Sequence, residues 1–211
     1  MADRVLRMGV VLAVVGVTVQ TVIHFFNYLA LDERYAEFDV SSEHTIFAWA
    51  ATAAAFGAAV AALVLALRRS DRRLLLLLAL LLAYFSLDDF VEIHERLGFE
   101  LAQGLGFSEN VSQRFWLVLF TPLFAFALWV LWRVAENSGG RPQRYQQLAI
   151  GLLLGGVFME AVGLVTKNLA DEGRDAPHVV RAAFEEGFEL GGWIILTAGL
   201  FAAFYASFED R

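Results

Sequence analysis

Ionisable side chains interrupt the long apolar stretches of this sequence at four places. In chain order they are His24; Asp88, Glu92, His94 and Glu95; Glu160; and Glu185 and Glu189. Carboxylate oxygens and imidazole nitrogens are the usual protein ligands of iron, manganese and zinc. The residue types therefore predict a site for a divalent metal ion (Fe, Mn or Zn), holding one ion or two.

The spacing places these groups on common helix faces. At 100° per residue, Asp88, Glu92 and Glu95 fall within about 60° of one another. Glu185 and Glu189 are one helical turn apart and form a second acidic stripe. One acidic residue at the centre of a bilayer costs about 2.5–3.5 kcal/mol, so we expect both stripes to face a shared interior site.

Positive side chains offer little compensation for these acids in the sequence. Arg96, Arg114, Lys167 and Arg181 lie near the predicted helix ends, and we expect none of them to reach deep enough to neutralise the carboxylates. The charges must then be held by protons, by water or by a bound cation.

Roles can be assigned to these residues as expectations. The expected metal ligands are His24, Glu92, His94, Glu160, Glu185 and Glu189, and the expected catalytic residues are Asp88 and Glu95. Asp88 could act as a ligand or as a proton shuttle. His94 points about 100° away from Glu95 on the helical wheel, so it fits a supporting position behind the ligands as well as a ligand. Glu95 could also mark only the exit of its helix into water.

The ligand types resemble those of di-iron and di-manganese helical bundles, which use Glu-x-x-His on two helices. This sequence has Glu92-x-x-Glu95 and Glu186-x-x-Glu189 instead. The departure disfavours a di-iron centre of that particular form and leaves a metal site of another kind. Zinc would need three protein ligands and a nearby carboxylate base.

The elements that carry these residues are predicted to be membrane spans. The chain has 211 residues, 58% of them hydrophobic, and its mean hydropathy is +0.58. About 20 apolar residues cross a bilayer as a helix, and the sequence contains six such segments, approximately 5–29, 45–67, 74–94, 115–134, 147–169 and 179–204. We predict an all-α integral membrane protein, a six-helix bundle forming one domain over residues 1–211.

Short loops predict the orientation of the bundle. Arginines gather between the second and third spans and between the fourth and fifth, at Arg68, Arg69, Arg72, Arg73, Arg133, Arg141 and Arg144. Acids gather in the other loops, at Asp32, Glu33, Glu37, Asp39, Glu43, Asp171, Glu172 and Asp175. The positive-inside rule then places both termini in the cytoplasm, and the site on the outer side of a bacterial inner (cytoplasmic) membrane.

Composition excludes several classes of site and partner. The chain has no cysteine, which excludes disulfides, thiolate metal sites and cysteine nucleophiles. Its net charge is −7, and its arginines do not form one basic face, so we expect no nucleic-acid partner. The lipid bilayer and a metal ion are the expected partners, with a lipid-soluble small molecule as a candidate substrate.

Two segments carry a resemblance to a known group. They are Leu87-Asp88-Asp89-Phe90-Val91-Glu92-Ile93-His94-Glu95 and Phe184-Glu185-Glu186-Gly187-Phe188-Glu189. Together they resemble uncharacterised bacterial multi-pass membrane proteins with an "LDE…IHE" segment on one helix and "EE..E" on a later one. Asp89 stands where that group has glutamate. The resemblance implies no activity, and it singles out the same helices as the physical argument.

Three functions fit these observations. The first is a metalloenzyme, redox or hydrolytic, acting on a lipid-soluble or periplasmic substrate. The second is a cation or proton transporter that uses the same carboxylates, although the cytoplasmic half of the spans offers few polar residues for a path. The third is a non-catalytic membrane subunit whose acidic vestibule docks a partner.

Overall fold

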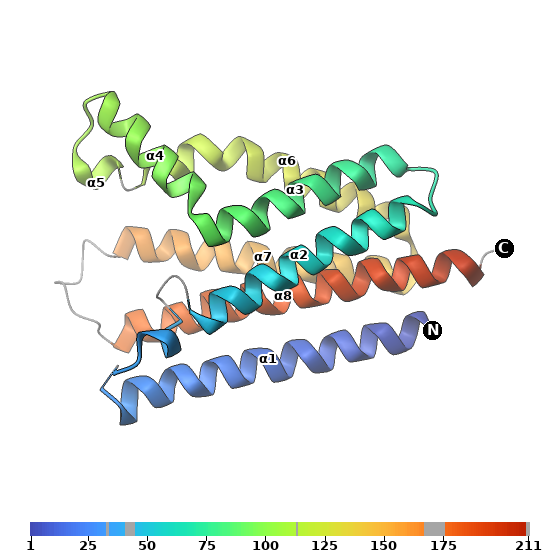
Figure 1. Cartoon of the computed structure of the whole chain (residues 1–211), viewed down its shortest axis with the longest axis horizontal. Coiled ribbons are helices and arrows are strands. Elements are labelled where there is room, and N and C mark those ends of the chain that lie inside the picture. The colour runs from blue at the N-terminus through green and yellow to red at the C-terminus, as the bar shows by residue number, and fades with distance from the viewer. Residues whose placement is uncertain (33, 41–44, 113, 167–175, 210–211) are drawn as a thin grey trace.

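The computed structural model describes residues 1–32, 34–40, 45–112, 114–166 and 176–209. Helices make up the regular structure of these ranges, and six of them are long and apolar enough to cross a membrane (Figure 1). These six are α1 (Ala2–Ala30), α2 (Ile46–Ala66), α3 (Arg72–Val91), α6 (Phe115–Ser138), α7 (Gly140–Thr166) and α8 (Ala176–Glu209). The protein is therefore an all-helical, multi-pass membrane protein, as the sequence predicts.

Three shorter helices lie in the connections. The 3₁₀ helix η1 (Ala36–Phe38) follows α1, and the helices α4 (Ile93–Gly104) and α5 (Glu109–Ser112) join α3 to α6. In Figure 1, α1, α3 and α7 end on the side of the bundle where α2, α6 and α8 begin, which we name the site end. The opposite side, where α1 begins and α8 ends, is the hairpin end.

Helix α8 is the central element of the bundle, because it packs against α7, α1 and α2. Glycine residues let α8 pack closely against α1 and against α7. A Cβ placed on Gly9 of α1 would lie 2.3 Å from Cβ of Ala198, and one placed on Gly192 of α8 would lie 2.8 Å from Cγ of Leu153. Glycine is therefore required at both crossings if the helices are to keep their separation.

The apolar core occupies the half of the bundle toward the hairpin end. It joins alanines of α2 to leucines of α3, valines of α6 and leucines of α8, and its fully buried members include Ala58, Ala62, Leu75, Leu78, Val130, Val134, Leu196 and Leu200. The small side chains of alanine on α2 let α3 and α8 approach this helix closely.

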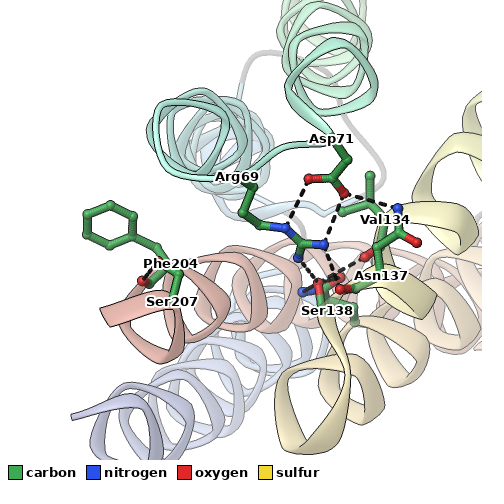
Figure 2. Close-up of polar contacts among 8 residues, drawn as sticks. Arg69, Asp71, Val134, Asn137, Ser138, Phe204 and Ser207 are labelled. Carbon is green, nitrogen blue, oxygen red and sulfur yellow. Dashed lines mark hydrogen bonds and ion pairs between the residues drawn. The ribbon is translucent and has the colours of Figure 1, made fainter. Parts of the chain in front are cut away.

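A polar network fixes the hairpin end (Figure 2). The guanidinium of Arg69, after α2, donates from Nε and Nη2 to the two carboxylate oxygens of Asp71, each at 3.0 Å. The same Nη2 donates to the carbonyl of Asn137 at the end of α6 (2.6 Å), and Asn137 Nδ2 donates back to Asp71 (3.0 Å). The α2–α3 turn is thereby tied to the end of α6.

Two predicted boundaries differ from the structure. The prediction of one helix from Leu74 to His94 was wrong at its end, because α3 stops at Val91 and a new helix begins at Ile93. The predicted gap between the fourth and fifth spans, 135–146, is also shorter, since only Gly139 separates α6 from α7, with φ of 63°. Of the acidic residues used to orient the loops, Glu33, Glu43, Asp171, Glu172 and Asp175 lie outside the described residues.

Candidate functional site

The candidate site begins at the break between α3 and α4. Glu92 has φ 58° and ψ 39°, the left-handed conformation that side-chain-bearing residues rarely adopt. Its N–H still donates to the carbonyl of Asp88 at 2.7 Å, which closes the last turn of α3. The backbone then turns, so that α4 starts in a new direction with His94 facing back toward α3.

Asp88 holds His94 by two contacts. Its carboxylate is buried, accepts the backbone N–H of His94 on Oδ1 at 2.9 Å, and pairs through Oδ2 with Nδ1 of the imidazole at 2.8 Å. Tyr84, one turn earlier on α3, donates its hydroxyl to the same Oδ1 at 3.4 Å. Because Nδ1 is occupied by the carboxylate, Nε2 is the nitrogen of His94 left to bind a ligand or to exchange a proton.

Aromatic rings of α6 surround the imidazole of His94. The ring of Trp116 lies edge-on with its centroid at 4.6 Å, and those of Phe120 and Phe124 lie at 5.9 and 6.4 Å. Gly98 of α4 permits this contact, because a Cβ at that position would lie 2.6–2.7 Å from the backbone N, Cα and Cβ of Trp116. The position of His94 therefore depends on the close packing of α4 against α6.

The environment of His94 favours its protonated form. Burial lowers the pKa of the imidazole, whereas the hydrogen bond to Asp88 and the negative charges of Asp88, Glu95 and Glu160 raise it. The net result is a pKa above the usual 6.5. His94 is thus an imidazole whose charge depends on surrounding carboxylates.

Helices α7 and α8 bring further carboxylates to the site end. Glu160 of α7 is half-buried, and its charge interacts with those of His94, Glu95, Glu185 and Arg181. Glu160 is therefore electrostatically coupled to α4 and α8 at once, although these helices are far apart in the sequence.

Arg181 corrects one expectation from the sequence. Instead of lying at the surface it is half-buried, forms an ion pair with Glu185 one turn further along α8, and donates to the carbonyl of Met159 at 3.2 Å. Gly163 of α7 makes room for it, since a Cβ there would lie 2.4 Å from Cζ of the guanidinium. One carboxylate of the site is therefore neutralised by a cation of the same helix.

Glu189 reaches toward the middle of the bundle. Its side chain packs on α7 at Gly156, where a Cβ would lie 2.7 Å from Cγ of Glu189. Its charge interacts with those of four carboxylates, at Asp89, Glu160, Glu185 and Glu186. Asp89 in turn accepts a hydrogen bond of 2.7 Å from the hydroxyl of Thr52 on α2.

Two of the expected ligands are engaged elsewhere. His24 is buried and accepts the N–H of Val40 on Nδ1 (3.3 Å), so its Nε2 carries the proton and donates to the carbonyl of Val179 (3.2 Å). Glu92 pairs through its carboxylate with Arg96 at 3.5 Å. The structure thus gives His24 a role in joining α1 to the start of α8, and Glu92 a role in the backbone turn.

The candidate ligands lie farther apart than the ligands of an assembled metal site. Within the ranges that the structure describes, no three His, Asp or Glu side chains are arranged so that they could hold one ion as they stand. His94, Glu95, Glu160, Glu185 and Glu189 nevertheless belong to one set of interacting charges. The arrangement can move protons between carboxylates and imidazole, or attract a cation from the site end.

Several residues of this set were not among the ligands or catalytic residues expected from the sequence. Thr52, Asp89, Glu186 and the aromatic residues of α6 all enter through contacts between helices. Trp116, for example, is 4% exposed and packs on His94. The adjacent acids Asp88-Asp89 and Glu185-Glu186 could have indicated these additional contacts. Two neighbouring residues point about 100° apart around a helix, so each acid of a pair can contact a different neighbouring helix.

Comparison with known proteins gives one match. A family model described as Domain of unknown function (DUF8692) matches residues 5–204. No curated protein and no solved structure matches the chain. The matched residues include every side chain of the site described above.

Proposed function

The chain belongs to the family described as a domain of unknown function (DUF8692), and we propose that it is a membrane-embedded metal-binding protein that acts as a metal-dependent enzyme. The site lies on the extracytoplasmic side in this proposal. Its substrate is a lipid-soluble or periplasmic molecule, and the reaction is redox or hydrolytic. The metal is iron, manganese or zinc.

The observation that carries the proposal is the pairing of Asp88 with His94. A histidine that binds a metal usually gives its other ring N–H to a carboxylate, which fixes the ring and makes the free nitrogen a better ligand. Asp88 occupies Nδ1 of His94 at 2.8 Å in this way, and the charges of Glu95 and Glu160 also act on the imidazole. An imidazole presented toward carboxylates is suited to a divalent ion.

The proposal gives each side chain a distinct role. In this proposal Nε2 of His94 and the carboxylates of Glu160, Glu185 and Glu189 would be the ligands, and Glu185 would exchange its ion pair with Arg181 for the metal ion. Asp88 positions His94 and is not itself a ligand. Glu95 is exposed at the mouth of the site, where its carboxylate can take a proton from a substrate or from water.

Packing in the other half of the bundle favours an enzyme over the alternative of a cation or proton transporter. The buried core toward the hairpin end consists of alanine, leucine, isoleucine and valine side chains. A hydrated ion would meet mainly apolar side chains along such a path, and the polar groups Gln146 and Thr197 in this half are already hydrogen-bonded within the protein. Reproducible ion flux in proteoliposomes that is lost in Glu160→Gln would reverse this ranking.

Metal analysis of the purified protein tests the proposal. Wild-type protein expressed in metal-replete medium is expected to retain Fe, Mn or Zn close to one or two equivalents, and Glu160→Gln and His94→Gln to lower the affinity at least about tenfold. Glu100→Gln is the matched control, because Glu100 is an exposed acid on α4. Equal metal content in wild type and Glu160→Gln would reject the proposed site.

A further inference from the structure

Gln20 is a buried polar side chain without a polar contact. It lies on α1 and is 2% exposed, and neither its Nε2 nor its Oε1 has a hydrogen-bond partner. Two other buried amides behave differently: Asn27 exchanges hydrogen bonds with the backbone of Tyr35, and Gln146 donates to the carbonyl of Gly199 at 3.2 Å. A buried carboxamide that lacks both a donor and an acceptor is costly to keep unless something else bonds it.

The packing of α1 on α8 gives the level of Gln20 in the bundle. At the site end, Ile23 of α1 packs in a small cluster with Ala182 of α8. The two helices run in opposite directions. One helical turn deeper than this contact, α1 therefore presents Gln20 and α8 presents Glu186.

Neighbouring contacts support this register. A Cβ at Gly187 would lie 3.2 Å from Cγ1 of Val17, which places these residues at the next level down. Val17 and Thr21 line an apolar groove of about 430 Å³ on one side of the α1–α8 contact, and Gln20 is not part of that groove. Gln20 is thus on the side of α1 that turns toward the interior of the bundle.

Glu186 connects this level to the candidate site. Its charge acts on Glu189, which also interacts with Asp89, Glu160 and Glu185. Glu186 therefore links the level of Gln20 on α1 to the interacting charges of the candidate site. The carboxamide oxygen can accept there from a metal-bound water, which donates its hydrogens, while the carboxamide NH₂ can donate to a carboxylate.

We propose that Gln20 is a positioning residue of the cation site, and that its carboxamide hydrogen-bonds the water shell of the bound cation beside Glu186. This inference rests on the proposed metal-binding function. It means that α1 contributes Gln20, and not His24, to the cation site. It also explains why the carboxamide of Gln20 is buried without a hydrogen-bond partner in the protein.

The test compares variants that keep volume and remove polarity. In Gln20→Met, the dissociation constant of the Fe²⁺, Mn²⁺ or Zn²⁺ ion that the purified wild type retains is expected to rise about tenfold, which corresponds to about 1.4 kcal/mol. The melting temperature of the metal-free protein is expected to stay the same or to rise, because the unpaired amide is gone. Gln20→Glu restores a polar oxygen and is expected to restore or tighten metal binding.

Gln146→Met is the control, because Gln146 is an equally buried glutamine whose hydrogen bonds lie at the hairpin end. It should lower the melting temperature and leave the metal dissociation constant unchanged. An unchanged constant in Gln20→Met, with metal bound normally by wild type, overturns the role of Gln20 alone. A wild type that binds none of the three ions overturns the proposed function together with this inference.

Discussion

At the scale of single residues, the contact between Asp88 and His94 has a measurable electrostatic consequence. The folded protein raises the pKa of His94 above the 6.5 of an unfolded chain. Protonated His94 therefore stabilises the fold fully below about pH 6.5, and this stabilisation is lost as the pH rises through the folded pKa. A paired carboxylate has the opposite effect, because its contribution to stability is lost as the pH falls.

We predict that the free energy of unfolding of chelator-treated protein falls as the pH is raised from about 6.5. The measurement is denaturant or thermal unfolding in detergent over a series of pH values. His94→Gln should remove this part of the slope, because glutamine does not titrate. Identical slopes in wild type and His94→Gln would show that the pKa of His94 is not raised by folding.

Thr52 provides a second test at this scale. Its hydroxyl donates to the carboxylate of Asp89 at 2.7 Å, so Thr52→Val leaves a half-buried acid without that donor. The expected loss of stability is about 1–3 kcal/mol, measured as a lower melting temperature. Thr52→Ser keeps the hydroxyl and should lose much less; equal losses in both variants would assign the effect to packing.

The sequence could single out residue types, whereas a shared site for them remains a prediction. Carboxylates inside apolar spans indicate an interior polar site, and Glu160, Glu185 and Glu189 do interact through their charges. The engagement of His24 by Val40 and Val179 could not be predicted, because both partners are backbone groups with no signature in residue type. The ion pair of Arg181 with Glu185 fits an i, i+4 spacing, but its burial depends on the glycine at position 163.

At the scale of elements, α4 is positioned by its crossing with α6. We predict that Gly98→Ala separates the two helices and lowers the stability by about 1–3 kcal/mol, since the new methyl group would overlap the backbone of Trp116. The matched control is Gly104→Ala at the end of the same helix, where an added Cβ meets nothing within 4 Å. Thermal unfolding of both variants gives the comparison, and equal melting temperatures would contradict the packing argument.

The junction between α3 and α4 predicts an unusual preference at position 92. A residue with a Cβ costs about 1–2 kcal/mol in the left-handed conformation, whereas glycine adopts it freely. Glu92→Gly should therefore be more stable than Glu92→Ala by about 1 kcal/mol, although alanine favours helices elsewhere. Both variants lose the pair with Arg96, so their difference in melting temperature reports the backbone alone. A more stable alanine variant would mean that α3 continues into α4 as one helix.

The six spans themselves could be predicted because hydropathy over about 20 residues is a strong local signal. The break at Glu92 gives no such signal, since the sequence has neither glycine nor proline there. It arises because the Asp88 carboxylate accepts the N–H of His94, an N–H that a continuous helix would bond to the carbonyl four residues earlier. The short α6–α7 connection was hidden for the opposite reason, because Gly139, Gly140 and Pro142 suggest a longer loop than the one residue that suffices.

At the scale of the whole molecule, the orientation in the membrane remains a prediction from loop arginines. The absence of native cysteine makes it testable with single substitutions. In intact cells, a membrane-impermeant maleimide is expected to label Gln103→Cys, exposed at the site end, and to label Ser70→Cys, exposed at the hairpin end, only after permeabilisation. The opposite pattern would place the site on the cytoplasmic side.

The central position of α8 has a consequence for how the protein is made. Helix α8 packs on α1, α2 and α7, and it follows all three in the chain, with 145 residues between Ala30 and Ala176 (176 − 30 − 1). At roughly 5–20 residues per second of synthesis, α1 waits on the order of 7–30 s for the helix that covers its buried face. During that interval Asp89 is synthesised and stands in or near the translocon before Glu189 of α8, with whose charge it interacts. Biogenesis of this protein therefore depends on holding an incomplete acidic bundle until its central helix arrives, and a ribosome that stalls before codon 176 leaves a product for the membrane proteases.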